Sequence, residues 1–313
     1  MTDAVLQLLR DRRKSGSGPG DRDDDARLVL LVEGGSSRGA YSSGMTIAVE
    51  RLGLLPAFDA VYGSSAGALN AAWLLCGRAE STQHAWWDPV IMRTTIDPRR
   101  LLWRRPVVDT HYLVNVVYTE VMPMGFGEIL DSAVEFHPIA TDAATGEPVD
   151  LHDLIHDQAS VRAALRASTA MPFLAGEPIG IDGRRYVDAG VSEAVPIRTA
   201  LAQKATHVVA LRTRRADETA MAPSRGERAL MSRWFARHAP GAGQTWLRRQ
   251  EIRAEEEKLL ASHPATLQIR PPAGSVRIGR TERRPQLLRA AVDTGRQAAL
   301  AAFADIAISG APR

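Results

Sequence analysis

The alternation of apolar runs and glycine-rich turns near the start of the chain predicts buried strands joined by helices. Residues 28–33, LVLLVE, form a continuous apolar run typical of a strand buried on both faces, and a glycine-rich turn follows. We expect a helix over about residues 39–52, a second strand over 58–63 and a second helix over 65–77. Helical crossovers are right-handed, so successive strands of this kind lie side by side and parallel.

Later segments predict two hairpins, further core strands and a closing helix. We expect one hairpin over residues 135–151, turning at 144–146, and another over 179–190, turning at Asp182-Gly183, a pair that suits positive φ. The other expected elements are core strands at 206–214 and 265–272, a helix at 161–170, helix and loop insertions over 80–135, and an amphipathic helix at 284–306. Together they predict an α/β fold with a mainly parallel central sheet flanked by helices.

The chain is long enough for one large core, but its first residues offer little to bury. Residues 11–27, DRRKSGSGPGDRDDDAR, combine glycine, proline, serine and dense charge. We therefore expect a disordered polar leader over residues 1–27. A single domain is expected over residues 28–309, since 313 residues with 45% hydrophobic content can bury one core.

Charge and cysteine content exclude several classes of function. The 39 basic and 36 acidic side chains leave a net charge of +3, without the basic footprint of a nucleic-acid-binding protein. The single cysteine, Cys76, excludes an intrachain disulfide and a multi-cysteine metal site, and it favours a reducing compartment. The N-terminal residues lack the apolar region of a secretory signal, and no apolar run is long enough for a transmembrane segment. We expect a cytoplasmic protein with no nucleic-acid partner.

A serine on a glycine-flanked turn is the first candidate for chemistry. Gly63-Ser64-Ser65-Ala66-Gly67 matches G-x-S-x-G between a predicted strand and a predicted helix, which is the context of a nucleophile elbow. Such a turn strains the serine backbone, and Gly63 and Gly67 let strand and helix pass without collision. Ser65 is a candidate nucleophile at the positive end of a helix, where negative charge is favoured. Because the motif also occurs by chance, Ser65 as only a helix N-cap stays an alternative.

A glycine-rich loop follows the neighbouring predicted strand. Residues 34–39, GGSSRG, place a second helix N-terminus beside Ser65, and bare backbone N–H groups there can hold the oxyanion of a tetrahedral intermediate. A tight turn that only permits packing is one alternative. A dinucleotide-binding loop requires glycine at position 36, where this chain has Ser36, and a phosphate loop requires Gly-Lys-Ser/Thr.

A carboxylate on a third tight turn can supply the base that a serine needs. Val187-Asp188-Ala189-Gly190 ends a predicted strand and presents Asp188 among small residues. In most serine hydrolases the base is instead a histidine oriented by a carboxylate. A surface or packing role is the better interpretation for every histidine, because none occupies an obvious glycine-flanked loop: His84, His111, His137, His152, His156, His207, His238 and His263.

The motifs GGSSRG, GSSAG and VDAG, in this order, resemble those of the patatin-like phospholipases. The segments ASTAMPFLAGEPI (167–179) and SEAVPI (192–197) add to the resemblance, which covers about residues 28–205. It implies the patatin-like three-layer fold, a lipid or other acyl-ester substrate, and a Ser-Asp dyad that needs neither histidine nor metal nor organic cofactor.

The resemblance also implies a role for each motif. Ser65 attacks the acyl carbonyl, and Asp188 takes and returns the proton. The oxyanion hole is formed by the glycine-rich loop, including Gly34, Gly35 and Ser36, with support from Arg38. An aspartate is a weak base at its ordinary pKa of about 4, so the dyad requires a dry, buried site.

The chain departs from the family pattern at two positions. Ser36 stands where the family usually has a third glycine, and Ala189 stands where the dyad turn usually reads Asp-Gly. An oxyanion hole that includes Ser36 is expected to need a negative φ there, and Ala189 needs a turn without positive φ.

The sequence leaves other interpretations open. A histidine-dependent α/β-hydrolase is one alternative function, and a non-catalytic nucleotide- or protein-binding module on the same fold is another. Residues 224–238 place Leu230, Trp234 and Phe235 near one helical face among arginines. This pattern suits a helix packed on the domain, or an interfacial helix in peripheral contact with a membrane. Three tryptophans suit an acyl pocket and core packing equally: Trp86, Trp87 and Trp103.

Overall fold

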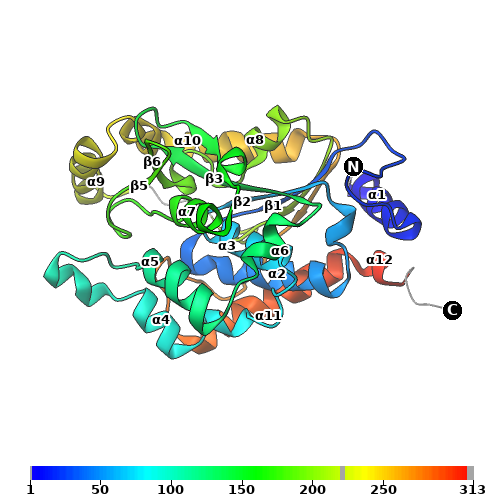
Figure 1. Ribbon diagram of the computed structural model, residues 1–313, viewed down its shortest axis with the longest axis horizontal. Coiled ribbons are helices and arrows are strands. Elements are labelled where there is room, and N and C mark those ends of the chain that lie inside the picture. Colours follow the sequence, from blue (N-terminus) through cyan, green and yellow to red (C-terminus); the bar gives the residue numbers. More distant parts are fainter. Residues whose placement is uncertain (1, 219–222, 309–313) are drawn as a thin grey trace.

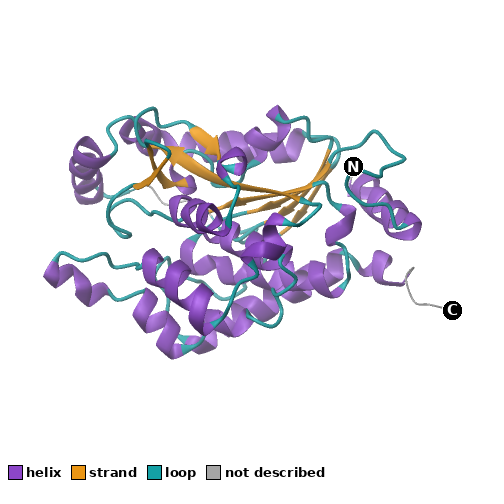
Figure 2. Cartoon of the chain, in the orientation of Figure 1, coloured by secondary structure: helices purple, strands orange, loops and turns teal. Residues whose placement is uncertain are grey.

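An eight-stranded sheet forms the centre of the molecule, with helices on both faces (Figures 1 and 2). The computed structural model describes residues 2–218 and 223–308. The strands run in the order β5-β6-β3-β2-β1-β7-β8, and β4 pairs with β3 beside that path. Their bounds are β1 Leu28–Val32, β2 Ala60–Ser64, β3 Glu135–Asp142, β4 Pro148–Asp150, β5 Ile179–Ile181, β6 Arg184–Asp188, β7 His207–Leu211 and β8 Thr266–Ile269.

The middle of the sheet is parallel, and one side is antiparallel. The pairs β2–β3, β1–β2, β1–β7 and β7–β8 are parallel, whereas β3–β4, β3–β6 and β5–β6 are antiparallel. Helix α2 (Gly39–Arg51) connects β1 to β2, and α10 (Ala242–Ser262) lies between β7 and β8 in the chain. The predicted α/β class with a mainly parallel sheet is confirmed, and so are both predicted hairpins.

The central strand β1 is apolar throughout because both of its faces are covered. In β1, Leu28, Leu30 and Val32 belong to the core shared with α2, α3 (Ala66–Leu75) and α11 (Pro285–Ala302). Val29 and Leu31 belong to a second core on the opposite face, shared with α8 (Ile197–Ala202) and α10. Successive side chains of a strand point to opposite faces, so one apolar run fills both cores.

Shorter helices lie around this framework. Helix α7 (Gln158–Ser168) packs on β3, β5 and β6. The predicted insertion before β3 contains α4 (Pro89–Thr95), α5 (Thr110–Tyr112), a π-helical stretch Leu113–Val121 and α6 (Phe126–Leu130). Helix α9 (Arg225–His238) precedes α10, and α12 (Ala304–Ile308) follows α11. Within residues 2–218 and 223–308, no helix has the length and apolar character that crossing a membrane requires.

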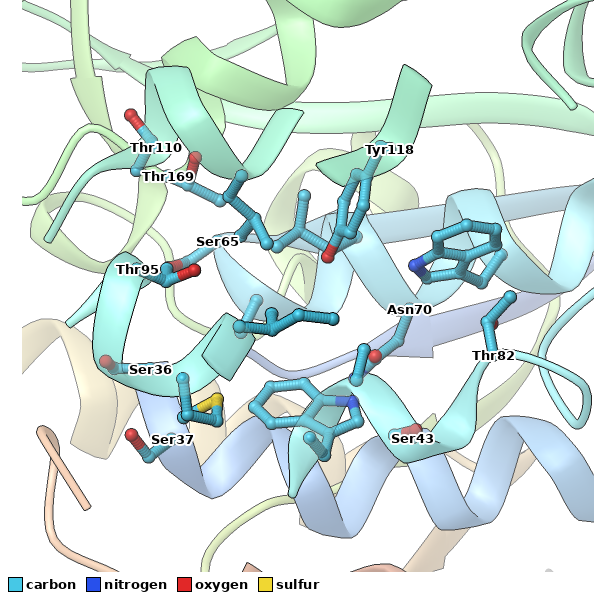
Figure 3. Close-up of a pocket in the computed structure, with 18 of the residues that line it drawn as sticks. Ser36, Ser37, Ser43, Ser65, Asn70, Thr82, Thr95, Thr110, Tyr118 and Thr169 are labelled. Carbon is cyan, nitrogen blue, oxygen red and sulfur yellow. The ribbon is translucent and has the colours of Figure 1, made fainter. Parts of the chain in front are cut away.

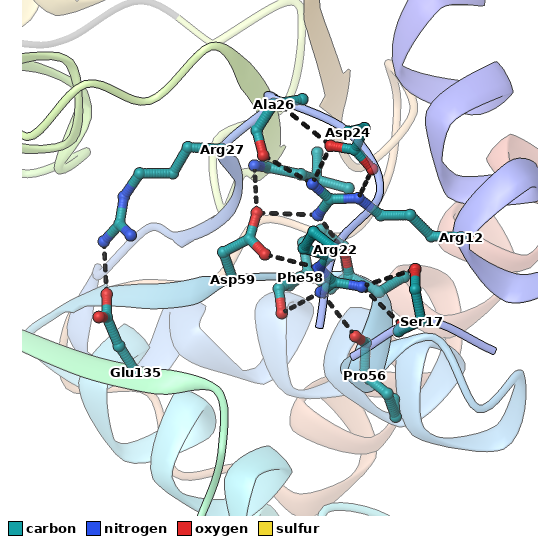
Figure 4. A network of polar contacts seen from close by, with 12 residues as sticks. Arg12, Ser17, Arg22, Asp24, Ala26, Arg27, Pro56, Phe58, Asp59 and Glu135 are labelled. Carbon is teal, nitrogen blue, oxygen red and sulfur yellow. Dashed lines mark hydrogen bonds and ion pairs between the residues drawn. The ribbon is translucent and has the colours of Figure 1, made fainter. Parts of the chain in front are cut away.

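The start of the chain is folded, which differs from the expected disordered leader. Helix α1 (Thr2–Ser15) packs beside β8 and α12, and its Val5 and Leu9 are fully buried. Arg12 is buried as well, and its guanidinium pairs with Asp24 at 2.7 Å and with Asp59 at 2.8 Å (Figure 4). Arg22 also pairs with Asp59, at 2.9 Å. Dense charge suggested a solvated segment, but these arginines bind a carboxylate of the domain, a long-range pairing that composition does not reveal.

Candidate active site

A strained turn presents Ser65 between β2 and α3. Ser65 has φ 55° and ψ −126°, a backbone conformation that non-glycine residues rarely adopt. A Cβ on Gly63 would lie 2.5 Å from the Ala68 Cα, and a Cβ on Gly67 would lie 2.1 Å from the carbonyl oxygen of Val32. Only glycine fits at either position, as the elbow motif predicted.

The sheet register brings Ser65 level with Asp188. Ser64 pairs with Ile139 of β3, and the next residue of β3, Ala140, pairs with Asp188 of β6. The Ser65 hydroxyl donates a hydrogen bond of 2.6 Å to Asp188 Oδ2. Both residues are only 6% exposed. The two residues that the sequence proposed as a dyad are therefore in direct contact.

Burial changes the acidity of Asp188. It raises the pKa of this carboxyl from 3.8 to about 6, although the hydrogen bonds from the Ser65 hydroxyl and the Gly190 N–H act in the opposite direction. The Gly190 N–H donates to Oδ1 at 2.7 Å, so each carboxylate oxygen accepts one hydrogen bond. A carboxylate with this pKa is a stronger base than an exposed aspartate and is still mostly ionised at pH 7.

A short segment at the end of α7 holds both members of the pair. The backbone N–H of Ser65 donates to the Ser168 hydroxyl at 2.9 Å, and the backbone N–H of Asp188 donates to the Ala170 carbonyl at 2.9 Å. The Thr141 hydroxyl donates to the Asp188 carbonyl at 2.9 Å. Sequence analysis noted the segment 167–179 only as part of a resemblance and assigned no role to Ser168 or Thr141.

The glycine-rich loop lies against Ser65. A Cβ on Gly34 would lie 2.9 Å from the Ser65 Cβ, and Gly35 has φ 146°. Within the described part of the chain, no hydrogen bond engages the backbone N–H of Gly35 or Ser36, and both residues line the same pocket as Ser65. Two free backbone donors thus lie at the edge of the site.

The two departures from the family pattern have different outcomes. Ser36 has φ 55°, not the negative φ that the sequence analysis required. Its left-handed backbone is held by its own hydroxyl, which donates to the Arg280 carbonyl at 2.6 Å, and Ser37 bonds to the same carbonyl. The serine at position 36 therefore adopts a conformation typical of glycine. Ala189 begins a 3-10 turn after Asp188 without positive φ, so the turn does not require glycine there.

An ion pair behind the loop fixes its position. Glu33 and Arg212 are both buried and pair at 2.9 Å. Burial opposes ionisation of Glu33, but the charge of Arg212 and the Thr213 N–H hold the pKa of this carboxyl below its usual range. The Thr213 hydroxyl in turn donates to the Gly34 carbonyl. These supports were missed by the sequence analysis, because they join the ends of β1 and β7 across about 180 positions.

Arg38 belongs to the same site, and its backbone N–H donates to the Gly35 carbonyl at 3.2 Å. It lines the pocket at Ser65, and its Nε is buried without a hydrogen-bond partner among the described residues. Burial, followed by the charge of Arg214, lowers the pKa of Arg38.

Two pockets meet at Ser65. The apolar pocket, of about 830 Å³ and partly open to solvent, extends from Ser65 between α3 and the insertion (Figure 3). Its apolar lining is Ala66, Leu69, Trp73, Ala79, Ala85, Trp86, Ile91, Met92, Ile96, Val108, Leu113, Tyr118 and Met171. Of the three tryptophans considered above, only Trp86 lines it, whereas Trp87 packs at the edge of the core and Trp103 is exposed.

The second pocket, called the arginine pocket below, is polar. It has a volume of about 1070 Å³, partly open to solvent, and it is lined by Ser65, Asp188 and the glycine-rich loop. It is also lined by five arginines: Arg38, Arg214, Arg249, Arg253 and Arg280. Helix α9 forms part of its wall, with Met231 and Phe235 buried against the domain and Leu230 46% exposed. The helix expected over 224–238 is therefore mainly a packed element.

No histidine lines either pocket, and all eight histidines lie within the described residues. The most buried one, His137, stacks between Tyr62 and His152 and contacts the carboxylates of Asp150 and Glu135. Among residues 2–218 and 223–308, no group of three or more histidine, cysteine or acidic side chains is arranged to hold a metal ion.

Comparisons with known proteins were made on both sequence and structure. The patatin family, described as patatin-like phospholipase, matches residues 30–201, more than half of the chain. The uncharacterized protein YjjU of Escherichia coli K12 is 29% identical over 195 residues, which cover 60% of this chain and 52% of that protein. The chain thus matches about half the length of this curated relative. The crystal structure of VipD from Legionella pneumophila aligns with 90% of this chain and 67% of its own, at 15% identity and a TM-score of 0.48.

Proposed function

Because the chain belongs to the patatin-like phospholipase family, we propose that it hydrolyses acyl esters of lipids through a dyad of Ser65 and Asp188. The observation that carries the proposal is the 2.6 Å hydrogen bond between the Ser65 hydroxyl and Asp188 Oδ2. It joins a serine on a strained elbow to a buried carboxylate whose pKa burial raises to about 6. Ser65 makes no other side-chain hydrogen bond through its hydroxyl within the described residues.

In the acylation half of the reaction, Ser65 Oγ attacks the carbonyl carbon of the ester while its proton passes to Asp188 Oδ2. The carbonyl oxygen becomes an oxyanion, and the free N–H groups of Gly35 and Ser36 are the donors proposed to hold it. The N-terminal end of α3 adds a favourable field for that charge. When the intermediate collapses, the ester C–O bond breaks, and Asp188 returns the proton to the departing alkoxide, which leaves as an alcohol.

In the deacylation half, the same groups act on water. Asp188 accepts a proton from the water that attacks the acyl-serine carbonyl, and the loop again holds the oxyanion. Collapse of this second intermediate breaks the bond to Ser65 Oγ, which regains the proton from Asp188, and a fatty acid is released. Apart from the substrate and one water molecule, every group that acts in these steps belongs to the chain.

The apolar pocket supports a lipid acyl chain as one part of the substrate. It begins at Ser65, and apolar side chains provide most of its wall. An acyl chain in this pocket would displace water from the dyad and so strengthen both the Ser65–Asp188 hydrogen bond and the oxyanion contacts.

The alternatives kept open by the sequence lack comparable support. A histidine-dependent hydrolase needs an imidazole within reach of Ser65, and no histidine lines either pocket among the described residues. A non-catalytic binding module gives no reason to keep a strained serine against a buried carboxylate, because both features cost free energy of folding.

The proposal is tested with a fluorophosphonate probe and a short nitrophenyl ester. Wild type should label covalently at Ser65 and hydrolyse the ester, and Ser65→Ala should do neither while keeping its circular dichroism spectrum. Folded wild-type protein that neither labels nor hydrolyses would support the binding module. Turnover by Ser65→Ala would end the proposal.

A further inference from the structure

The pocket on the polar side of Ser65 brings five arginines together from four parts of the chain. Arg38 follows the glycine-rich loop, Arg214 follows β7, and Arg280 lies in the loop before α11. Arg249 and Arg253 are one helical turn apart on α10 and so share a face of that helix. Like charges that converge in this way repel one another unless nearby opposite charges neutralise them.

Three carboxylates line the pocket, and they offset these charges only in part: Glu33, Asp188 and Glu227. Asp188 accepts hydrogen bonds from Ser65 and Gly190. It forms no ion pair with an arginine among the described residues, although the charges of Arg280 and Arg253 act on it. Glu33 belongs to the ion pair behind the glycine-rich loop and lies 3.9 Å from the Arg214 Nε. Glu227 lies 3.7 Å from Arg249. Three of the five arginines form no ion pair with any residue in the described part of the chain: Arg38, Arg253 and Arg280.

Arg253 shares one unfavourable feature with Arg38, a buried Nε without a hydrogen-bond partner in the described part of the chain. Burial, together with the charges of Arg214 and Arg280, lowers the pKa of Arg253 to about 10. An unpartnered buried donor costs free energy of folding, and such costs are frequent at functional sites. Arg253 as a whole is partly buried, so only the buried Nε carries this cost.

We propose that the arginine pocket binds phosphate, and that the preferred substrates are acyl lipids with a phosphomonoester close to the ester that is cut. The inference rests on the proposed function, because it treats the pocket as the binding site for the polar part of the substrate. Guanidinium groups bind phosphate oxygens through paired hydrogen bonds, and a dianion suits three unpaired cations better than a monoanion does.

The same pocket disfavours a choline headgroup. Quaternary ammonium groups bind best between several aromatic faces, and the described lining of this pocket offers two aromatic side chains, Phe173 and Trp246. The guanidinium of Arg249 already covers the Trp246 ring at 3.8 Å from its centroid. An ammonium group there would also face the unpaired arginines. We therefore expect discrimination against zwitterionic lipids as well as against neutral ones.

The test compares substrates that share one oleoyl chain and differ in the polar part. They are oleoyl lysophosphatidic acid, oleoyl lysophosphatidylcholine and monooleoylglycerol, with p-nitrophenyl butyrate as a reporter of the Ser65 chemistry. For wild type, kcat/KM should be at least 10-fold higher on lysophosphatidic acid than on either other lipid, and the difference should lie mainly in KM.

Variants then assign that preference to the pocket. Arg253→Met keeps the length of the side chain and should reduce the ratio of kcat/KM between lysophosphatidic acid and monooleoylglycerol by about 10- to 100-fold, the worth of one hydrogen bond to a charged group. Arg280→Met changes an exposed side chain, keeps the backbone carbonyl that Ser36 and Ser37 contact, and should act in the same direction. Arg248→Met is the matched control, because Arg248 lies on the same helix, is exposed and pairs with Glu251 outside the pocket.

The outcomes separate this inference from the proposed function. Hydrolysis of the nitrophenyl ester without a phosphate preference overturns the inference and leaves the Ser65 chemistry standing. If wild-type protein neither hydrolyses the nitrophenyl ester nor reacts with the fluorophosphonate probe, both the phosphate inference and the proposed function are overturned. If inorganic phosphate alters nitrophenyl ester hydrolysis while the lipids are cut equally, the pocket binds free phosphate and the headgroup assignment is wrong. An unchanged lipid ratio in folded Arg253→Met and Arg280→Met also refutes it.

A second inference comes from an exposed apolar segment elsewhere. Residues 97–107, here called the arm, connect α4 to α5 and project from the end of the molecule where α9 also lies (Figure 1). Leu101, Leu102 and Trp103 are consecutive residues of the arm, and they are 49%, 80% and 66% exposed. Three consecutive apolar side chains exposed on a protein surface indicate a contact with an apolar partner.

Cations flank this apolar triplet. Arg99 pairs with Asp97 and Arg100 pairs with Asp109, so their charges are largely neutralised. Two further arginines of the arm, both exposed, form no ion pair within the described residues: Arg104 and Arg105. Leucine and tryptophan beside free arginines are the residues that an anionic lipid surface binds.

The base of the arm is part of the apolar pocket. Ile96 and Val108 pair across it as an antiparallel bridge, and both line the pocket that begins at Ser65. From this continuity we infer that the arm inserts its apolar triplet into an anionic membrane, which places the wall of the apolar pocket beside the lipid.

Sedimentation with phosphatidylglycerol-containing vesicles tests the arm. Wild type should bind them more tightly than pure phosphatidylcholine vesicles, and the double variant Leu102→Asp/Trp103→Asp should lose at least 10-fold in affinity. Val121→Asp, which changes an equally apolar exposed residue outside the arm, is the matched control. Failure of wild type to bind, equal binding by the double variant, or self-association through the arm in size-exclusion chromatography would refute the inference. Hydrolysis of nitrophenyl butyrate in the same samples reports the Ser65 chemistry separately.

Discussion

Replacing Asp188 by asparagine is expected to remove ester hydrolysis and, at the same time, to stabilise the fold at neutral pH. Asp188 is 6% exposed, and burial raises its pKa from 3.8 to about 6. A carboxylate in this position serves as a base but is expensive to keep ionised. Asparagine has nearly the same shape and carries no charge. Its carbonyl can accept from the Gly190 N–H, and its amide can donate to Ser65 Oγ. Both contacts are therefore kept, with the direction of the bond to Ser65 reversed and the Ser65 proton without its former acceptor.

The size of the stability change follows from linkage between protonation and folding. A carboxyl whose pKa is 3.8 when unfolded and about 6 when folded binds its proton more tightly in the folded state. Its contribution to stability is fully present below pH 3.8 and is lost as the pH rises through 6, and the total loss is about 3 kcal/mol. Asparagine does not titrate. The unfolding free energy of Asp188→Asn should therefore exceed that of wild type by up to about 3 kcal/mol near pH 7.5, with little gain near pH 4.

The assay combines urea unfolding at about pH 4 and pH 7.5 with initial rates on a nitrophenyl ester. The rate should fall by about 10²- to 10⁴-fold in Asp188→Asn, which is the usual worth of a general base. For wild type, kcat/KM should decrease as the pH falls through about 6, since protonation of Asp188 removes the base. Asp131→Asn, at the exposed end of α6, is the control for a carboxylate outside the site.

Two results would refute this reasoning. An Asp188→Asn protein with wild-type turnover would show that another group takes the serine proton. A stability difference between variant and wild type that is equal at the two pH values would show that Asp188 does not bear the cost of burial assigned to it.

Three further predictions concern the loop, the histidines and the N-terminal helix. Gly35→Val should lower ester hydrolysis by at least about 100-fold, because its Cβ would lie 2.9 Å from the Thr213 hydroxyl and 3.1 Å from the Arg38 Cβ; near-normal rates would move the oxyanion hole elsewhere. Each of the eight His→Ala variants should keep substantial activity if folded, and one as inactive as Ser65→Ala would restore the triad. Arg12→Met should lower the unfolding free energy by about 3–5 kcal/mol by urea titration, because it leaves two carboxylates without their buried partner; unchanged stability would contradict the anchoring of α1.

Local patterns allowed most of the sheet to be predicted. The run at 28–33 is apolar on both faces because two cores need it, and the pair Asp182-Gly183 adopts φ 48° and 76° in the turn that it predicted. The elbow at Ser65 could also be predicted, because the steric limit at Gly63 comes from the nearby Ala68, although the limit at Gly67 comes from Val32 of the neighbouring strand. Conformations that depend on residues close in the sequence can be predicted from the local sequence pattern.

Contacts between distant segments leave no comparable signal. Ser168 accepts from the Ser65 N–H across 103 positions, and nothing in its helical context distinguishes it from an ordinary helix-end serine. The left-handed φ of Ser36 depends on the Arg280 carbonyl, 244 positions away. Arg12 looked solvated because its partner Asp59 lies in another part of the chain. In each case the sequence shows the residue type, and only the fold supplies the partner that decides its role.

Several unfavourable local features of this fold lie around one pocket, and some of them act on one another. Ser65 and Ser36 are backbone outliers, Asp188 is a buried acid, and Arg253 is a partly buried cation without an ion-pair partner in the described chain. The charges of Arg280 and Arg253 lower the pKa of Asp188, while burial raises it more strongly. A phosphate bound to those arginines would cancel part of their field, and the pKa of Asp188 would rise toward the working pH, where a general base is most effective. Binding of the polar part of the substrate would then strengthen the base that cuts its ester, which gives the unpaired arginines a role beyond affinity.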